Sequence, residues 1–420
     1  MAGRDLLLIS HLDCRYYANQ RTHHLARALA GGQDRVTVIY RKYTQPEGAA
    51  ARRRAFLSMH LETLEEDGIR YVGVDPLFDL SVRGFSGSGG AAAATGAPAP
   101  GMSAELKGLA GYVLEQSLRW WFLWAALRER RRWGVVVAEG VWALSAALAL
   151  RRLGRAAAVV CDDYDFTPGG YNRSRLRRRW VAATENRLLR RADRVVCVGE
   201  MLARRREADC GCRPEVIPNG VDYEAFAPAA GKPPHPPTLI YVGGLEYWTG
   251  LDLALDALPG LRARFPELRL RIVGYGDPAY GAHLRRRIRE EGLEEAVEWV
   301  GRVAYEALPE QLATADIGLA MFEPNDLRRY AFSLKVVEYM AAGVVPVATR
   351  DTQSAALALA HGAGVEAGYD ARSLEQAVAG LLADPARLKA LGERGNRQAR
   401  AYRWPDLTRR FGELVAELGG

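Results

Sequence analysis

The sequence is poor in the residue types that build metal centres and disulfide frameworks. Its 420 residues contain five cysteines and seven histidines. The cysteines have neither the even pairing of a secreted disulfide scaffold nor the two-by-two spacing of a zinc site. Cys210 and Cys212 lie close together, but no second pair of ligands follows them. We therefore expect no bound metal and a location in the reducing cytoplasm.

Long apolar runs are missing as well. No stretch reaches the roughly 18 uninterrupted apolar residues of a membrane-spanning helix. The first five residues run directly into a strand-like segment, so we expect no signal peptide. A hydrophobic fraction of 49% with 25% charged residues is typical of a globular protein. A chain of this length is longer than a single hydrophobic core usually accommodates, so we expect two domains.

Acidic residues are outnumbered only in the first half of the chain. Residues 1–220 hold 34 Lys and Arg against 23 Asp and Glu, a balance of +11, whereas residues 221–420 hold 23 against 27, a balance of −4. Such asymmetry indicates either a first domain that faces an anionic substrate or surface, or an arginine-rich composition on ordinary solvated helices. The basic half lacks aromatics interleaved with its basic runs, so we do not expect nucleic-acid binding.

Strand-like and helix-like segments alternate along the chain. Strands are predicted at 5–10, 35–40, 69–73, 133–139, 156–161, 193–198, 238–242, 268–273, 297–300, 317–320 and 344–348, and helices at 21–30, 51–67, 103–133, 142–153, 173–191, 251–265, 374–382, 385–402 and 406–418. This alternation predicts an α/β protein with parallel sheets covered by helices, in which ligands lie beyond the carboxyl ends of the strands. Residues 84–101 are rich in Gly, Ala and Pro and are predicted to be a mobile loop.

Residues 328–348 combine a polar segment, a short helix and a buried strand. An anion at the start of this helix would meet free backbone N–H groups, the positive end of the helix dipole and Lys335. Glu338 follows one turn later on the same face and can accept two hydrogen bonds from a diol. This pattern suits the diphosphate and ribose of a nucleotide, and it equally suits a solvated Lys–Glu pair on a surface helix.

Three carboxylates follow the strand predicted at 156–161, namely Asp162, Asp163 and Asp165. They provide a candidate general base for an acceptor hydroxyl, because clustered like charges raise at least one pKa. The alternative is a turn that caps the helix at 173–191 and pairs with its arginines. In the second half, glycines directly follow strands, at Gly243, Gly244, Gly274 and Gly276. Such glycines let a phosphate or a base approach the backbone.

Together these segments resemble the GT-B glycosyltransferases, nearest to family 4. The resemblance rests on residues 328–348, on the phrase Ile-Pro-Asn-Gly-Val-Asp at 217–222 and on the glycine turns. It implies two Rossmann-like, doubly wound domains that face each other across a cleft. Residues 1–215 would bind the acceptor, residues 216–403 would bind the donor, and residues 404–420 would form a helix that returns to the first domain.

The resemblance implies transfer of a sugar from a nucleoside diphosphate sugar, UDP- or GDP-linked, to an acceptor hydroxyl without a metal or other cofactor. The acceptor classes left open are a natural product, a glycan and a lipid-linked molecule. Lys335 would hold the diphosphate, Glu338 the ribose and Val303 the base. The predicted donor site also includes Tyr330, Phe332, Ser333, Leu334, Gly243, Gly244, Thr249, Gly274, Gly276 and Arg302. The predicted catalytic residues are Asp165, Asp162 and Lys335, and the predicted acceptor-binding residues are His11, Arg15, Tyr16 and Tyr17.

Three residues depart from the family pattern. Tyr330 stands where the family often has a glutamate, and Gly244 and Thr249 stand where it has an arginine and a lysine that hold the diphosphate. These departures leave open whether the transfer is retaining or inverting. They also leave two alternatives to a transferase: a catalytically degenerate partner subunit and a sugar-nucleotide epimerase.

Trp120, Trp121 and Trp124 precede a cluster of four arginines, Arg128, Arg130, Arg131 and Arg132. Indole rings and guanidinium groups both gain at the surface of an anionic bilayer, so residues 118–133 are a candidate for peripheral contact with the inner face of the membrane. The alternative is a core helix whose apolar face needs bulky residues.

Overall fold

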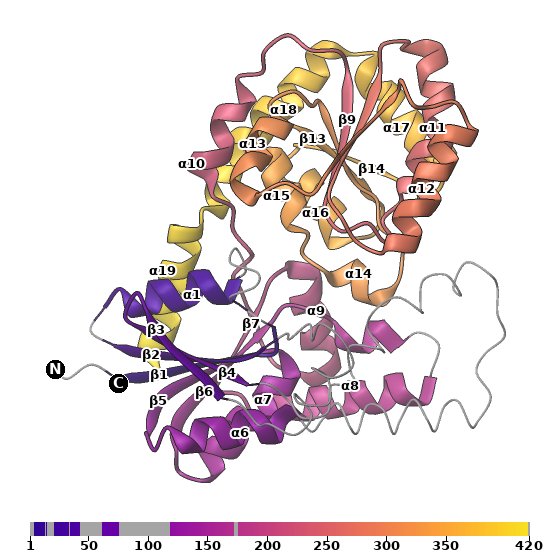
Figure 1. The fold of residues 1–420 in the computed structure, drawn as a ribbon. Coiled ribbons are helices and arrows are strands. Elements are labelled where there is room, and N and C mark those ends of the chain that lie inside the picture. Colours follow the sequence, from indigo (N-terminus) through magenta and orange to yellow (C-terminus); the bar gives the residue numbers. More distant parts are fainter. Residues whose placement is uncertain are drawn as a thin grey trace, which may run out of the picture. The chain divides into compact units, whose positions relative to one another are not determined.

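The structure is a computed structural model that describes residues 4–12, 14, 21–32, 34–42, 61–74, 118–171 and 175–418. These residues form two compact units (Figure 1). The chain passes from the first unit to the second at 218/219 and returns to the first at 404/405, where the sequence predicts 215/216 and 403/404. The predicted loop at 84–101 lies outside the described residues.

The sheet of the first unit has the order β3-β4-β2-β1-β5-β6-β7-β8. Its strands are β1 (Asp5–Ser10), β2 (Arg35–Arg41), β3 (Leu61–Glu66), β4 (Ile69–Val74), β5 (Trp133–Glu139), β6 (Ala156–Asp163), β7 (Arg194–Cys197) and β8 (Glu215–Val216). All neighbours pair in parallel except β3, which is antiparallel to β4. The central strands are nearly continuous apolar runs because helices cover both of their faces.

The helix predicted at 51–67 is wrong for its described part. Residues 61–66 form β3, which joins β4 through Asp67 and Gly68, both with positive φ angles of 52° and 75°. Asp-Gly is a hairpin signal because both residues tolerate positive φ. β3 is an edge strand with exposed glutamates on it, so its composition is that of a solvated helix although its structure is extended.

Helices cover the two faces of this sheet (Figure 1). One face carries α1 (Arg21–Ala30) and α19 (Trp404–Glu417), and the other carries α6 (Leu118–Arg128), α7 (Gly140–Arg152), α8 (Arg175–Leu189) and α9 (Glu200–Cys210). The helix predicted at 103–133 ends at Arg128, and Trp133 begins β5; residues 103–117 are outside the described part of the chain. Among the described helices, none combines the length and the apolar composition needed to cross a bilayer.

The last helix packs on the first unit, which confirms the predicted return of the chain. Leu407, Phe411 and Leu414 belong to the same buried cluster as Leu25 of α1. A guanidinium nitrogen of Arg410 donates to the Val216 carbonyl at 3.2 Å. The helix begins two residues earlier than predicted, because a proline in the first turn needs no N–H partner.

The sheet of the second unit has the order β11-β10-β9-β12-β13-β14, and all its strands are parallel. Its strands are β9 (Thr238–Val242), β10 (Arg269–Val273), β11 (Val297–Gly301), β12 (Ile317–Ala320), β13 (Val345–Thr349) and β14 (Val365–Ala367). Its longer helices are α11 (Leu251–Arg264), α12 (Pro278–Glu290), α15 (Leu334–Ala341), α16 (Gln353–Ala360), α17 (Ala371–Leu382) and α18 (Pro385–Ala399), and the short ones are α10 (Tyr223–Phe226), α13 (Leu308–Leu312) and α14 (Asp326–Tyr330). The strand order reverses between β9 and β12, the kind of place where ligands bind in open α/β sheets.

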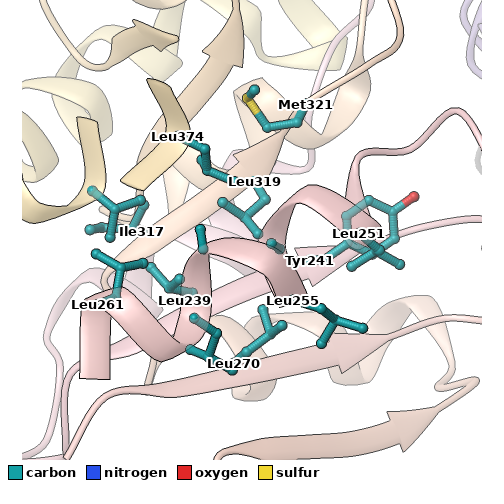
Figure 2. Close-up of a cluster of buried hydrophobic side chains, with 14 of the residues drawn as sticks. Leu239, Tyr241, Leu251, Leu255, Leu261, Leu270, Ile317, Leu319, Met321 and Leu374 are labelled. Atoms are coloured by element: carbon teal, nitrogen blue, oxygen red, sulfur yellow. The ribbon is translucent and has the colours of Figure 1, made fainter. Parts of the chain in front are cut away.

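The core of the second unit lies between this sheet and its helices (Figure 2). Leu239 of β9, Leu270 of β10 and Ile317 of β12 meet Leu255 of α11, and all four are almost fully buried. Sheets of parallel strands with helices on both faces in each unit confirm the predicted doubly wound α/β class.

Candidate functional site

The Lys335 side chain lies at the strand-order reversal of the second unit. Its ammonium nitrogen is 4.0 Å from the ring centroid of Tyr241 on β9 and 5.0 Å from that of Phe322, which follows β12. Two rings that come from either side of the reversal thus hold this cation by cation–π contacts. The ammonium occupies the position where the sheet rule places a ligand.

Lys335 has no counter-ion in the part of the chain that the structure describes. Its contacts there are the two rings and the electrostatic effect of Glu338, and no carboxylate lies within ion-pair distance. Burial lowers the pKa of Lys335 to about 7, and the Glu338 charge offsets this in part. A desolvated cation without a partner costs free energy, and an anionic ligand would recover it.

The first turn of α15 is open to the same ligand. Ser333 is the N-cap residue with an extended backbone, and its side chain makes no capping hydrogen bond. The first N–H groups of the helix therefore lack the usual side-chain acceptor. Together with the positive end of the helix dipole and Lys335, these groups can bind a phosphate.

Glu338 is 8% exposed, and the Tyr305 side chain interacts with its carboxylate. Burial raises the pKa of Glu338 to about 7, while Lys335 and Tyr305 oppose the shift. The interpretation of Lys335 and Glu338 as a solvated surface pair is therefore wrong. A buried carboxylate is a good hydrogen-bond acceptor for a diol.

The glycines after β9 and β10 mainly let two turns touch each other. A Cβ on Gly274 would overlap the Gly243 carbonyl oxygen, and a Cβ on Gly276 would overlap the Leu245 backbone. Gly243 has φ of 138°, and a Cβ there would meet the Lys335 ammonium at 2.9 Å. A Cβ on Gly244 would have more room, because its nearest neighbour, the Tyr275 carbonyl oxygen, would be 4.0 Å away. Of these four glycines, Gly243 is the one whose Cβ position lies next to the Lys335 ammonium.

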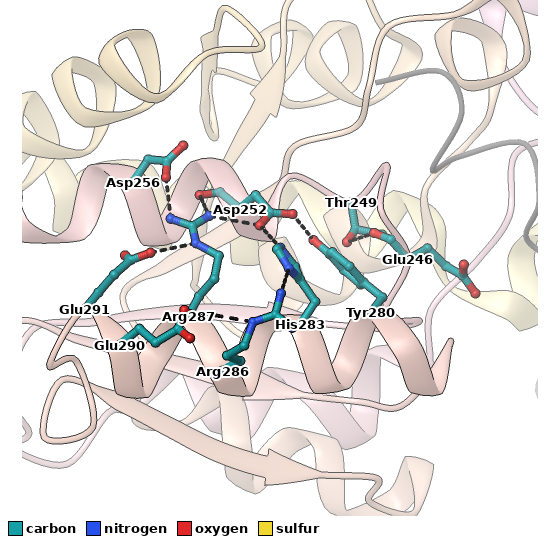
Figure 3. A network of polar contacts seen from close by, with 10 residues as sticks. All are labelled: Glu246, Thr249, Asp252, Asp256, Tyr280, His283, Arg286, Arg287, Glu290 and Glu291. Carbon is teal, nitrogen blue, oxygen red and sulfur yellow. Dashed lines mark hydrogen bonds and ion pairs between the residues drawn. The ribbon is translucent and has the colours of Figure 1, made fainter. Parts of the chain in front are cut away.

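The loop between β9 and α11 is held by a polar network that the sequence analysis missed (Figure 3). Thr249 is buried, and its hydroxyl donates to the Glu246 carbonyl at 2.6 Å, so this side chain supports the turn and does not face solvent. Asp252, at the start of α11, accepts hydrogen bonds from Tyr280 at 2.9 Å and Arg287 at 2.9 Å, and a ring nitrogen of His283 lies 2.8 Å from it. These α12 partners are about thirty residues away, so no local pattern indicates them.

The two candidate donor-site arginines, Arg302 and Arg328, differ in their pairing. Arg328 forms an ion pair with Glu323 at 2.9 Å and stacks over Trp248 at 4.2 Å, so it is already neutralised. Arg302 is exposed and stacks over Tyr275 at 4.6 Å, next to the half-buried Val303. Tyr275 is also exposed, which leaves an aromatic ring and a guanidinium plane at the ends of β10 and β11.

The remaining predicted donor residues support α15. Tyr330 and Phe332 are buried, and the Phe332 ring lies 6.2 Å from that of Tyr402. Ser333 and Leu334 are half-buried at the start of the helix. Tyr330 and Phe332 therefore position the helix, and the ligand-facing groups of this segment come from its first turn.

In the first unit, polar groups gather where β1, β5 and β6 end. His11 lies against Gly140, and its Nδ1 is 2.9 Å from the Tyr164 hydroxyl. Burial lowers the pKa of His11 to about 4, so this imidazole is neutral at physiological pH. Arg15, Tyr16 and Tyr17 lie outside the described residues, so of the predicted acceptor-binding set the structure places His11.

Two of the three clustered aspartates are structural. Asp162 is fully buried and accepts two hydrogen bonds from Arg21 at 2.7 and 2.9 Å. Asp163 is buried with Arg206 of α9, at 2.7 and 3.2 Å. The turn interpretation predicted that the aspartates pair with the arginines of α8. Asp162 and Asp163 instead pair with arginines of α1 and α9. Asp162 is a poor candidate for a base, because Arg21 holds both of its oxygens.

Asp165 reaches solvent, beyond the end of β6. Its surroundings desolvate the carboxylate, and this effect together with the Asp163 charge raises the pKa of Asp165 to about 7. A carboxyl with a pKa near the working pH is suited to general base chemistry. The three aspartates thus separate into two buried ion pairs and one candidate base.

Glu139, at the end of β5, was missed by the sequence analysis. It is buried, and its Oε2 accepts a hydrogen bond from Thr22 at 2.5 Å, while Oε1 has no partner among the described residues. Burial, and then the Asp162 charge, raise the pKa of Glu139 to about 7. The one sequence feature that could have indicated Glu139 is its position as a polar residue at the end of a buried strand. The described residues contain no group of three or more His, Cys, Asp or Glu that could hold a metal.

Comparison with known proteins gives matches in both halves. Residues 222–398 match the family described as Glycosyl transferases group 1, and residues 105–225 match Glycosyltransferase Family 4. D-inositol 3-phosphate glycosyltransferase 2 of Catenulispora acidiphila is 30% identical over 244 residues, which are 52% of this chain and 55% of that protein. Phosphatidyl-myo-inositol mannosyltransferase of Mycobacterium leprae is 31% identical over 213 residues, 48% of this chain and 54% of that protein. The chain thus spans about half the length of the curated relatives it matches.

Solved structures match over the whole chain. Sucrose-phosphate synthase from Thermosynechococcus elongatus superposes with a TM-score of 0.69 at 19% identity and covers 99% of both chains. Anabaena HepE in complex with UDP gives a TM-score of 0.62 at 14% identity, over 98% of this chain and 100% of that one. At these identities the likeness concerns the fold. Together with the two family matches, it shows that the chain belongs to the GT-B glycosyltransferases of the family 4 type.

Proposed function

We propose that this protein transfers a sugar from a nucleoside diphosphate sugar to the hydroxyl of an acceptor, without a metal. The observation that carries the proposal is the Lys335 ammonium, which lies at the strand-order reversal between Tyr241 and Phe322. No carboxylate among the described residues forms an ion pair with it. A diphosphate is the anion that this position and the open start of α15 suit best.

In the proposed reaction each group has one task. Lys335 and the first N–H groups of α15 bind the diphosphate and stabilise the charge that develops on it as the sugar leaves. Glu338 accepts hydrogen bonds from the ribose. Val303, with Arg302 and Tyr275 beside it, flanks the base. Asp165 takes the proton of the acceptor hydroxyl, and His11 contributes to the acceptor site in its neutral form.

The loss of the family's loop cations gives Lys335 most of the diphosphate charge to bind. Gly244 and Thr249 supply no charge, and Arg328 is neutralised by Glu323. One ammonium and one helix start are a smaller set of positive groups than the family pattern provides. We therefore expect weaker binding of free nucleoside diphosphate than in members that keep both cations.

Nucleotide-induced thermal stabilisation tests the proposal first. The protein is heated with UDP, GDP, ADP, CDP or dTDP, and sugars are then screened on the base that raises the melting temperature most. At a ligand concentration of about 100 Kd the expected stabilisation is about 2.7 kcal/mol. No shift with any of these nucleotides contradicts the donor site.

Product analysis then separates the chemistries. Because the relatives named above carry inositol phosphate and phosphatidyl-myo-inositol in their names, inositol phosphates and phosphatidylinositol are the first acceptors to test. A glycosylated acceptor supports the transferase. A changed sugar nucleotide in the absence of acceptor supports an epimerase, and nucleotide binding without any turnover supports a degenerate partner subunit.

A further inference from the structure

The α6 tryptophans differ in exposure, and Trp120 lies outside the core of the first unit. The residues of this helix that are buried in the core are Phe122, Leu123, Ala125 and Ala126. Trp120 is 58% exposed, and Trp121 and Trp124 are half-buried. Core packing therefore does not require Trp120, and the interpretation of 118–133 as a helix whose bulky residues serve the core is wrong for this residue.

A second exposed indole lies in the same helical layer. Trp180 of α8 is 41% exposed, and α7 contacts both α6 and α8. Figure 1 shows α6, α7 and α8 on one side of the sheet. Of the five large hydrophobic residues that are exposed in the described chain, three belong to this layer: Trp120, Trp180 and Leu153 at the end of α7. Exposed large apolar groups on neighbouring helices of one layer indicate an interaction surface.

The charge around these indoles is positive. Residues 118–194 contain 17 arginines and seven acidic residues. Four of the acidic side chains are buried, namely Glu139, Asp162, Asp163 and Glu185. Of the other three, Glu129 pairs with Arg70 at 2.8 Å, Asp193 pairs with Arg151 at 2.5 Å, and Asp165 is exposed beyond the end of β6. Exposed arginines of this face and its edge include Arg128, Arg130, Arg132, Arg152, Arg155, Arg178, Arg179 and Arg187.

Guanidinium groups also lie directly on the indoles. Arg119 is 4.9 Å from the Trp120 ring, and Arg128 is 5.0 Å from the Trp124 ring. Each such pair presents an apolar ring together with a cation that can bind a lipid phosphate. Indoles and basic heads are enriched where a protein meets the headgroup region, and a negative surface attracts arginines without any spanning segment.

We propose that the outer face of α6, α7 and α8 docks on an anionic lipid bilayer, with Trp120 and Trp180 inserted at headgroup depth and the arginines on lipid phosphates. Charge complementarity favours a bilayer over a protein partner, because the exposed charge of the face is almost entirely of one sign. This inference goes beyond the proposed transferase reaction and does not depend on it. It attributes the excess of positive charge in the first half of the chain to a membrane-docking surface rather than to substrate binding alone.

Vesicle sedimentation with the full chain tests the proposal. We expect the protein to bind vesicles of phosphatidylcholine and phosphatidylglycerol and to bind pure phosphatidylcholine far less. Replacing Arg128, Arg130 and Arg132 by Gln should weaken binding to the anionic vesicles about 100-fold, since each arginine near a negative surface contributes roughly a factor of five. Added salt should weaken it as well, because the attraction is screened.

The double variant Trp120→Ser/Trp180→Ser should weaken vesicle binding about ten-fold, because two indoles no longer insert. Leu359→Ser is the matched control, since Leu359 is an exposed apolar residue of α16 in the second unit, and it should bind as the wild type does. Equal binding to both vesicle compositions, or a double variant that binds like the wild type, overturns the proposal. Nucleotide-induced stabilisation should be unchanged in all these variants, so a failure of docking is distinguishable from a failure of the donor site.

Discussion

Lys335 shows how a single residue acquires a role that its neighbours in sequence do not reveal. The chain marks it as a lysine in the first turn of a short helix, which is compatible with a solvated side chain. The rings that hold its ammonium, Tyr241 and Phe322, come from two different strands. Their meeting at the strand-order reversal desolvates the cation, which has no counter-ion among the residues that the structure describes.

Lys335→Met should abolish nucleotide-induced stabilisation and lower turnover by orders of magnitude, because the diphosphate loses its cation. The unliganded protein should keep or slightly gain stability, since methionine fills a similar volume without a desolvated charge. Thermal melts with and without nucleotide, and turnover with the preferred donor, measure both effects. Lys389→Met is the matched control on the exposed surface of α18. Near-normal turnover of Lys335→Met contradicts the assignment.

Gly243→Ala should destabilise the protein by about 1–3 kcal/mol, because an L-residue is strained at φ of 138°. It should also weaken donor binding, since the new Cβ would press on the Lys335 ammonium at 2.9 Å. Gly281→Ala is the control: its Cβ would meet nothing within 4 Å, and alanine in a helix gains about 0.5–1 kcal/mol over glycine. Urea unfolding of both variants measures the difference, and equal effects would contradict the packing described here.

Glu139 predicts a pH dependence of stability. Its pKa is about 7 in the folded protein against an ordinary value of 4.5, so the folded state binds more protons than the unfolded state between these values. The unfolding free energy that Glu139 contributes is therefore complete below pH 4.5 and is lost as the pH rises towards 7, by at most about 1.4 kcal/mol per pH unit. The Gln side chain of Glu139→Gln cannot titrate. The unfolding free energy of the wild type minus that of the variant, measured by urea unfolding, should therefore fall between pH 5 and 7. A difference that stays constant over this range would contradict a raised pKa of the buried Glu139 carboxyl.

At the scale of elements, the carboxyl ends of parallel strands bring distant residues together. β6 ends in Asp162 and Asp163, and each finds its arginine on a different helix, Arg21 on α1 and Arg206 on α9. Arg206 is fully buried and also lies 2.8 Å from Glu185 of α8. These ion pairs join β6 to helices on both faces of the sheet, so they fix the end of the strand from which Asp165 emerges.

Arg206→Met should cost about 3–5 kcal/mol of unfolding free energy, because it leaves Asp163 and Glu185 buried without their cation. Arg204→Met, on the exposed side of the same helix, should change stability by less than about 0.5 kcal/mol. Urea unfolding at pH 7 compares the two. A small loss for Arg206→Met would mean that the triad does not hold β6, α8 and α9 together.

For the whole molecule, the decisive feature is that the last helix belongs to the first unit. α19 contributes Leu407, Phe411, Leu414 and Val415 to the core that β1, β2 and α1 build some four hundred residues earlier. In the part of the chain that the structure describes, the crossings at 218/219 and 404/405 therefore connect the same two units.

Phe411→Ala should destabilise the first unit by about 3–5 kcal/mol, because a fully buried ring is replaced by a cavity. Gly412→Ala, next to it on the same helix, is the control, since its Cβ would meet nothing within 4 Å. Calorimetry should show a loss of stability in Phe411→Ala and none in Gly412→Ala. Nucleotide-induced stabilisation should persist, because Lys335 and Glu338 belong to the second unit.

Sequence alone determined what is encoded locally. Alternating apolar runs and helical periods indicated the doubly wound class, and the segment at 328–348 with the glycine turns indicated the family, because these signals depend on neighbouring residues. It misassigned β3, where the charged composition of an edge strand resembles that of a solvated helix and the Asp67-Gly68 turn was the better signal.

Tertiary structure decided whatever depends on partners far along the chain. Asp162 meets Arg21 across 141 positions, which makes it an ion-pair residue and leaves Asp165 as the candidate base. The sheet order places Tyr241 and Phe322 around Lys335, and the packing of α6 turns Trp120 outward. The physical reason is the same in each case: burial and charge pairing are set by which elements meet, and a local sequence pattern carries no information about that.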